Sequence, residues 1–149
     1  MSAKSEKAKE LFLKGYNCSQ AVVGAFCEDL GLDFDTAMKL SSSFGGGMGR
    51  LREVCGAVSG MFILAGLKYG YADSCDKSAK TEHYKLIQDM AAKFKEQNGS
   101  IICRELLNLG DKKESHIPDD RTKEYYKKRP CVELVETAAK IAEEFLNNK

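Results

Sequence analysis

Six cysteines are the residues of this 149-residue chain best suited to chemistry. They are Cys18, Cys27, Cys55, Cys75, Cys103 and Cys131, and none of them forms a CxxC pair with another. Zinc ribbons, thioredoxin-like proteins and ferredoxins all use such closely spaced pairs. A redox or metal site built from these thiols therefore has to be assembled by the fold from distant segments.

Four of these cysteines lie where the sequence predicts the first turn of a helix. They are Cys18 after the N-cap Asn17, Cys55 after a glycine-rich loop, Cys103 after the cap Ser100, and Cys131 after Pro130. Unpaired backbone N–H groups and the positive end of the helix dipole stabilise a thiolate there, so we expect the pKa of each of these four thiols to be lowered. Cys27 and Cys75 lack such a position, and we interpret them as packing residues.

The segment that leads into Cys55 reads SFGGGMGRLREVCGAVSG. Gly56 and Gly60 are one helical turn apart and leave room for a partner helix, a second thiol or a bound cofactor close to the backbone. The preceding glycines allow the loop to turn its N–H groups inward as an anion-binding nest, and Arg50 and Arg52 add positive charge. The lysine and hydroxyl residues of a P-loop are missing, which argues against nucleotide binding. These features make Cys55 the predicted nucleophile.

Apolar periodicity and capping residues predict helices almost throughout the chain. We expect them over residues 3–14, 18–30, a short stretch that begins after Asp33 or Asp35 and reaches Ser41–Ser43, 53–69, 77–97, 101–109, 119–127 and 130–147. No segment reads as a convincing strand, so the predicted fold is an all-α, single-domain bundle of about six to eight helices over residues 1–149. In a strictly up-and-down bundle, the four cysteine-bearing helices would point the same way and bring their thiols to one end.

The charge pattern limits the partners of the chain. Acidic and basic residues are interspersed and give a formal net charge of +1, which argues against a nucleic-acid ligand or an anionic membrane surface. The longest apolar run, residues 58–67, is too short for a membrane span, which takes about 20 residues. The charged N-terminus lacks the apolar core of a signal peptide. We therefore expect a cytoplasmic protein, in whose reducing surroundings cysteines are redox-active, metal-bound or packed in the core.

The same residues carry a resemblance to a known family. NCSQAV at Cys18, SFGGGMGR, CGAVSG and LAGLKYG, followed by Cys103 and Cys131, resemble the family of redox-active proteins named for its C, CGAxxG, C, C pattern, over about residues 15–147. The resemblance implies a small, soluble, redox-active protein, with no settled substrate, reaction or cofactor. The positions that it marks as functional are Cys18, Cys55, Gly56, Ala57, Gly60, Cys103 and Cys131.

Two kinds of chemistry fit the four marked cysteines. In the first, which we favour, two or more of them cycle between thiol and disulfide with an unknown protein or small-molecule redox partner, as in a thiol oxidoreductase, and Cys55 attacks. In the second, the four thiolates hold one zinc ion or an iron–sulfur cluster. A third, structural interpretation is an interaction module in which the cysteines only pack.

Overall fold

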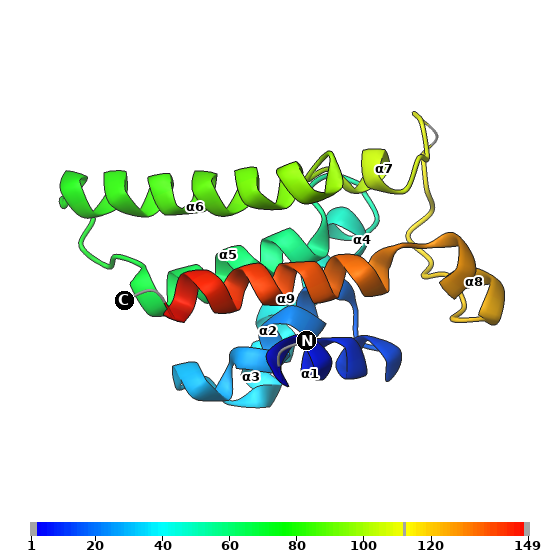
Figure 1. The fold of residues 1–149 in the computed structure, drawn as a ribbon, viewed down its shortest axis with the longest axis horizontal. Coiled ribbons are helices and arrows are strands. Elements are labelled where there is room, and N and C mark those ends of the chain that lie inside the picture. The colour runs from blue at the N-terminus through cyan, green and yellow to red at the C-terminus, as the bar shows by residue number, and fades with distance from the viewer. Residues whose placement is uncertain (1–2, 112, 148–149) are drawn as a thin grey trace.

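Three long helices lie lengthwise beside one another and form the body of the protein (Figure 1). The structure is a computed structural model that describes residues 3–111 and 113–147. The three helices are α5 (Gly56–Tyr69), α6 (Lys77–Asn98) and α9 (Cys131–Asn147). Helices α5 and α9 run in the same direction, and α6 runs opposite to both. The shared direction of α5 and α9 is what brings Cys55 and Cys131 to the same end of the body.

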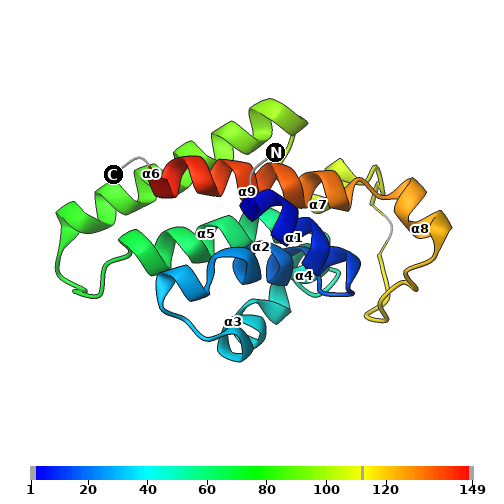
Figure 2. The ribbon, with the colours of Figure 1, turned by 60° about the horizontal axis from the view of Figure 1, so that its bottom comes forward.

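A second group of helices packs on α5 and α9 from the other side (Figures 1 and 2). It consists of α1 (Ala3–Leu13), α2 (Cys18–Phe26) and α3 (Phe34–Ser41), with short 3₁₀ turns at Glu28–Leu30 and Ser42–Phe44. Helix α2 lies between α1, α3 and α5, so its small and β-branched side chains are almost all buried. The N-terminus of α2 is held by a capping box, in which Asn17 accepts from the N–H of Gln20 (2.9 Å).

The remaining helices are short and lie near the cysteine end of the body. They are α7 (Cys103–Leu106) and α8 (Lys123–Lys128), while the turn labelled α4 (Gly45–Met48) is not a right-handed helix. Without α4, the described residues contain eight helices and no strand, which confirms the predicted all-α class. The helix predicted over 18–30 ends early at Phe26, and the one predicted over 101–109 has only one turn. None of the described helices is long and apolar enough to cross a membrane.

The core follows the apolar stripe of α9. Leu134, Val135, Ala138, Ile141 and Ala142 recur at helical spacing and are all buried against α1, α5 and α6. The stripe begins at Cys131, so the same periodicity that anchors α9 in the core also turns its first residue inward. The site therefore continues the hydrophobic core at one end of the helix body.

Gly56 and Gly60 allow α2 to approach α5 closely. A Cβ atom on Gly56 would lie 2.8 Å from the carbonyl oxygen of Phe44 and 3.2 Å from Cβ of Cys18. A Cβ atom on Gly60 would lie 3.0 Å from Cβ of Val22. These distances are too short for a side chain, so the predicted close approach of a partner helix is confirmed, and the partner is α2.

The glycine-rich loop before Cys55 has a left-handed backbone. Gly46, Gly47, Met48, Gly49 and Arg50 are consecutive and have φ values between +64° and +70°. The turn is closed by hydrogen bonds from the N–H of Gly49 to the carbonyl of Gly45 (2.9 Å) and from the N–H of Glu53 to the carbonyl of Gly47 (3.0 Å). Glycine adopts this conformation freely, whereas non-glycine residues pay about 1–2 kcal/mol each.

That loop packs directly on the cysteine end of the molecule. A Cβ atom on Gly47 would lie 2.7 Å from Cβ of Cys103 and 2.7 Å from Cα of Arg52. Arg52 itself is left-handed, with φ of +63°. Backbone strain of this kind is retained where the surrounding structure over-determines it, which is common at functional sites.

Candidate functional site: a cavity lined by four cysteines

Cys18, Cys55, Cys103 and Cys131 line one cavity of about 70 Å³ at the end of the helix body. Each of them begins a helix or, for Cys55, caps one, so the predicted first-turn positions are confirmed. Three of the four are nearly inaccessible to solvent, with exposed fractions of 4% to 7%, and Cys18 is half-buried. The fold therefore brings together the four cysteines that the sequence singled out.

The two remaining cysteines lie elsewhere. Cys27 is fully buried at the end of α2, where its thiol lies 3.7 Å from the carbonyl oxygen of Gly24. Cys75 is exposed in the loop before α6. Neither lines the cavity. The interpretation as a packing residue is confirmed for the buried Cys27 and is wrong for Cys75, because the loop before α6 leaves it exposed.

Backbone pairing, rather than regular up-and-down alternation, positions Cys103 beside Cys55. The N–H of Cys55 donates to the carbonyl of Ile101 (2.8 Å), and the N–H of Cys103 donates to the carbonyl of Glu53 (2.6 Å). These bonds flank a single antiparallel bridge between Val54 and Ile102. Helix α7 is only one turn long, so this bridge, and not a long helix, determines where its thiol lies.

Cys131 and Cys18 lie in the same cavity and shift each other's pKa. A hydrogen bond from Cys18, the nearby Arg129 and a hydrogen bond from Tyr125 lower the pKa of Cys131 to about 7, although burial opposes them. The same hydrogen bond, together with burial, raises the pKa of Cys18 well above its ordinary value. Of these two thiols, Cys131 is therefore the one that ionises more readily.

Cys55 and Cys103 behave differently. Burial raises the pKa of Cys55 to about 12, even though the N–H groups of Ala57 and Val58 oppose it. Burial also raises the pKa of Cys103, and the nearby Arg52 only partly offsets this. The expectation that a helix N-terminus lowers the pKa of all four thiols is therefore wrong for three of them. Burial raises the pKa of Cys55 and Cys103, and the interaction with Cys131 together with burial raises that of Cys18.

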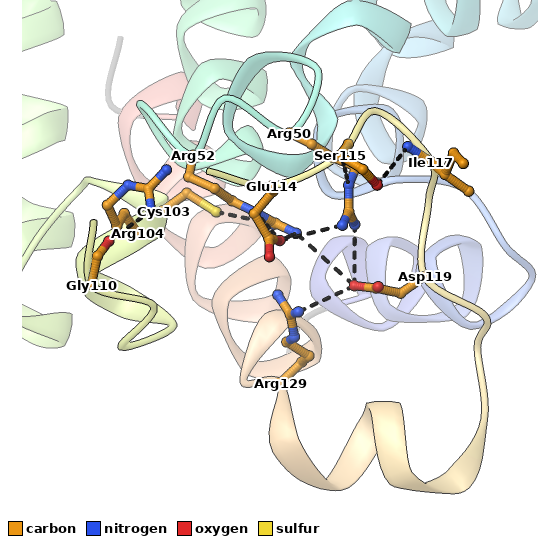
Figure 3. Close-up of polar contacts among 10 residues, drawn as sticks. All are labelled: Arg50, Arg52, Cys103, Arg104, Gly110, Glu114, Ser115, Ile117, Asp119 and Arg129. Atoms are coloured by element: carbon orange, nitrogen blue, oxygen red, sulfur yellow. Dashed lines mark hydrogen bonds and ion pairs between the residues drawn. The ribbon is translucent and has the colours of Figure 1, made fainter. Parts of the chain in front are cut away.

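An ion-pair cluster covers the Cys103 side of the cavity (Figure 3). Arg52 is buried and donates from Nη1 to Sγ of Cys103 (3.5 Å) and from Nη2 to Oε1 of Glu114 (2.6 Å). Burial lowers the pKa of Arg52, but these two partners reverse the effect, and the hydrogen bond from Arg52 lowers the pKa of Glu114. Arg52 thus connects a cavity thiol, through hydrogen bonds, to the polar segment that contains Glu114.

A protein-family comparison agrees with this geometry. A family model described as "Putative redox-active protein (C_GCAxxG_C_C)" matches residues 16–145, which include all four cavity cysteines. The chain belongs to this family. No curated protein and no solved structure matches it.

Two glycines of the family motif have different places in the structure. Gly56 lines the cavity beside the thiols. Gly60 does not line it, because it lies one turn further along α5 and contacts Ser19 and Val22 of α2. In this member of the C_GCAxxG_C_C family, the first motif glycine borders the site and the second serves helix packing.

The four thiols do not form a recognisable metal site. Among residues 3–111 and 113–147, no group of three or more cysteine, histidine or acidic side chains has an arrangement that could hold a metal ion. A tetrahedral zinc site or an iron–sulfur cluster requires donors that converge on one point, so the described residues give no support to the metal site that the sequence left open.

Several site residues of this family member have no counterpart in the sequence prediction. Tyr125 and Arg121 line the cavity, and Arg129 lowers the pKa of Cys131. The basic run that ends at Arg129 is typical of an exposed helix end. Arg129 lies only two residues before Cys131, and this proximity is a signal that could have indicated its effect on the thiol. Arg121 offers no such signal, because it is distant in sequence from all the cavity cysteines and lies in a polar segment that only the fold brings to the cavity.

Proposed function

We propose that this protein is a thiol–disulfide oxidoreductase in which Cys131 is the attacking thiolate and Cys18 is the resolving thiol. The observation that carries the proposal is that Cys131 lies in one cavity with Cys18, where the Cys18 thiol, Arg129 and Tyr125 lower the pKa of Cys131. The attacking thiol in disulfide exchange reacts best when its pKa is close to the ambient pH, and a resolving thiol has to be within bonding reach. Cys131, rather than the predicted Cys55, meets the first condition.

The reaction transfers two electrons from the dithiol to a disulfide substrate. The Cys131 thiolate attacks one sulfur of the substrate, forms a mixed disulfide and releases the other sulfur as a thiolate. The Cys18 thiol then gives up its proton and attacks Sγ of Cys131. This step forms the Cys18–Cys131 disulfide and releases the second half of the substrate as a thiol. Two substrate sulfurs are reduced, two cysteine sulfurs are oxidised, and an external thiol reverses the process.

Cys103 and Cys55 are the second dithiol of the cavity in this proposal. Cys103 is close enough to both Cys131 and Cys55 for their charges to interact. A Cys103 thiolate that attacks Sγ of Cys131 frees Cys18, and Cys55 then attacks Sγ of Cys103. The first dithiol is restored, and the two-electron oxidation is held as a Cys55–Cys103 disulfide. The cytoplasm, where thiol reductants are abundant, remains our predicted location for such a cycle.

Oxidation of anaerobically purified protein tests the proposal. We would count free thiols before and after treatment with 2-hydroxyethyl disulfide, a neutral oxidant, and map the products by peptide mass spectrometry. Metal and acid-labile sulfide are measured on the same sample. We expect thiols to disappear in pairs, with a Cys18–Cys131 disulfide as the first product. A Cys75→Ser variant is the matched control and should behave like the parent, because Cys75 lies outside the cavity.

Two results would overturn the proposal. One is about one equivalent of bound metal or cluster together with protection of the four cavity thiols, which would make the protein a metalloprotein. The other is a failure of the cavity thiols to pair while Cys75 reacts alone, which would support the interpretation that the cavity cysteines only pack.

A further inference from the structure

A second, larger cavity of about 260 Å³ adjoins the thiol cavity. We call it the arginine vestibule, because its lining includes Arg50, Arg52, Arg121, Arg129 and His116. The two cavities have several lining residues in common, which are Asn17, Gly46, Arg52, Arg121 and Tyr125. A molecule held in the vestibule therefore lies next to the thiols. The volume is slightly below the roughly 300 Å³ at which drug-sized ligand pockets begin, so it suits a small molecule.

The vestibule holds more positive than negative charge (Figure 3). Asp119 accepts from Nη1 of Arg50 (3.1 Å) and from Nη2 of Arg129 (3.1 Å). Glu114 contacts Nη2 of Arg50 (3.3 Å) and also pairs with Arg52. The vestibule thus has four guanidinium groups against two carboxylates, and these carboxylates pair with only three of the four. Guanidinium groups are permanently charged, so this excess does not disappear within the physiological pH range.

Arg121 is the cation that these carboxylates do not reach. It donates to the carbonyl oxygens of Phe12 (2.8 Å) and Tyr16 (3.0 Å), and its guanidinium carbon lies 4.1 Å from the centre of the Phe12 ring. Among the described residues it makes no ion pair, although it is half-buried and lines both cavities. Neutral partners orient the guanidinium but leave its charge uncompensated. Partial burial of such a charge is unfavourable until an anion neutralises it.

From this arrangement we infer that the arginine vestibule binds the carboxylate of a small anionic disulfide and so delivers its S–S bond to Cys131. The inference rests on the proposed function and adds the substrate class. Planar guanidinium groups bind carboxylates through paired hydrogen bonds, which fixes the orientation of the bound molecule as well as its charge. Arg121 borders both cavities, so a carboxylate on Arg121 leaves the rest of the substrate directed toward the thiols.

The chemical step is the exchange described above, with a carboxylate-bearing disulfide as the oxidant. Cys131 forms a mixed disulfide with one half of the substrate and releases the other half as a carboxylate-bearing thiolate. Cys18 then forms the intramolecular disulfide, and its proton is taken up by the departing sulfur. One substrate disulfide becomes two thiols, and one dithiol in the protein becomes one disulfide.

A charge series of small disulfides tests the inference. The probes are 3,3′-dithiodipropionate (dianionic), 2-hydroxyethyl disulfide (neutral) and cystamine (dicationic), which have two-carbon arms on each sulfur. Each rate of oxidation of the reduced full-length protein is divided by the rate of the same probe with dithiothreitol, which removes differences in intrinsic reactivity. We expect the normalised rate to be about tenfold higher for the dianion than for the neutral disulfide, and lowest for the dication. Added sulfate should slow the dianion selectively.

Variants of Arg121 locate the effect. Arg121→Gln should lower the ratio of the dianion rate to the neutral-disulfide rate about tenfold, whereas Arg121→Lys should retain most of this preference. Lys123→Gln is the matched control, because it removes one positive charge from an exposed residue outside both cavities. Circular dichroism reports whether each variant folds, and the three-probe comparison on the parent protein requires no variant.

The outcomes separate the inference from the proposed function. Equal normalised rates for the three probes would overturn the anionic substrate class while leaving the thiol exchange intact. A preference for the dianion that survives Arg121→Gln but is lost in Lys123→Gln would also overturn it. If none of the probes oxidises the Cys18–Cys131 pair, it is the proposed function that fails.

Discussion

The two sides of the thiol cavity start from similar helix geometry and differ in the charges around the sulfur. Cys131 begins a helix of 17 residues and Cys55 caps one of 14, so both face the positive end of a long helix. The pKa of Cys131 nevertheless falls to about 7, while that of Cys55 rises to about 12. Cys131 has Arg129, Tyr125 and the Cys18 thiol as partners, whereas Cys55 has mainly backbone N–H groups to set against its burial.

The difference shows how little a helix terminus does on its own in a buried site. The dipole contributes about 0.3–1 kcal/mol at an exposed helix end, while full burial can shift a pKa by several units in the opposite direction. A thiol therefore becomes reactive here only where side chains add charge or hydrogen bonds. In the proposed function the two sides accordingly have separate roles: attack at Cys131 and Cys18, and storage of the disulfide at Cys103 and Cys55.

Replacing each of the two candidate nucleophiles in turn tests the difference between the two sides of the cavity, with the largest expected effect. Cys131→Ser should slow the reduction of 2-hydroxyethyl disulfide at pH 7 by at least about tenfold, because the remaining cavity thiols are almost entirely protonated. Cys55→Ser should change this initial rate less than about twofold, since the buried Cys55 thiol takes no part in the first attack on the substrate. Stopped-flow measurement of the released 2-mercaptoethanol gives both rates. The reverse order of the two variants would reinstate Cys55 as the nucleophile.

Removing the positive charge of Arg129 tests the same difference between Cys131 and Cys55, with a smaller expected effect. Arg129→Gln should raise the pKa of Cys131 by up to about one unit, because the thiolate loses a nearby positive charge. The pH at which the thiolate forms then moves upward, toward the ordinary value near 9. Lys128→Gln is the control, because it removes an exposed charge from the adjacent position. A thiolate absorbance titration at 240 nm reads the shift, and equal shifts in the two variants would show a long-range charge effect instead.

The sequence predicted the helices well because their signals are local. Asn17 caps α2, the apolar stripe from Leu134 to Ala142 identifies α9, and the glycines of the CGAVSG motif fit a close helix contact. The four cavity cysteines were also identified, because each comes directly after a helix-start signal. These features depend on neighbours within a few residues, which the sequence displays directly.

The order of reactivity within the cavity could not be predicted in the same way. It depends on burial and on contacts between residues far apart in the chain, such as Cys18 with Cys131 and Arg52 with Glu114. Arg50 and Arg52 are close to Cys55 in sequence, yet Arg52 directs its guanidinium to Cys103 and Arg50 reaches Asp119. Proximity in sequence suggested that these positive charges act on Cys55, whereas the two guanidinium groups contact Cys103 and Asp119.

The measurement that tests the central claim most directly is the pH dependence of alkylation at each cysteine of the reduced protein. Iodoacetamide is uncharged and reacts with thiolates, so a short pulse at each pH followed by peptide mass spectrometry gives one titration curve per residue. Cys131 has a lowered pKa, so its labelling should rise with pH through a midpoint near 7 and level off above 8, while Cys55 stays unlabelled through pH 9. At pH 7 we expect Cys131 to react about sixfold faster than an ordinary thiol, after allowance for the lower intrinsic nucleophilicity of its thiolate. A Cys55 midpoint below that of Cys131 would contradict the account.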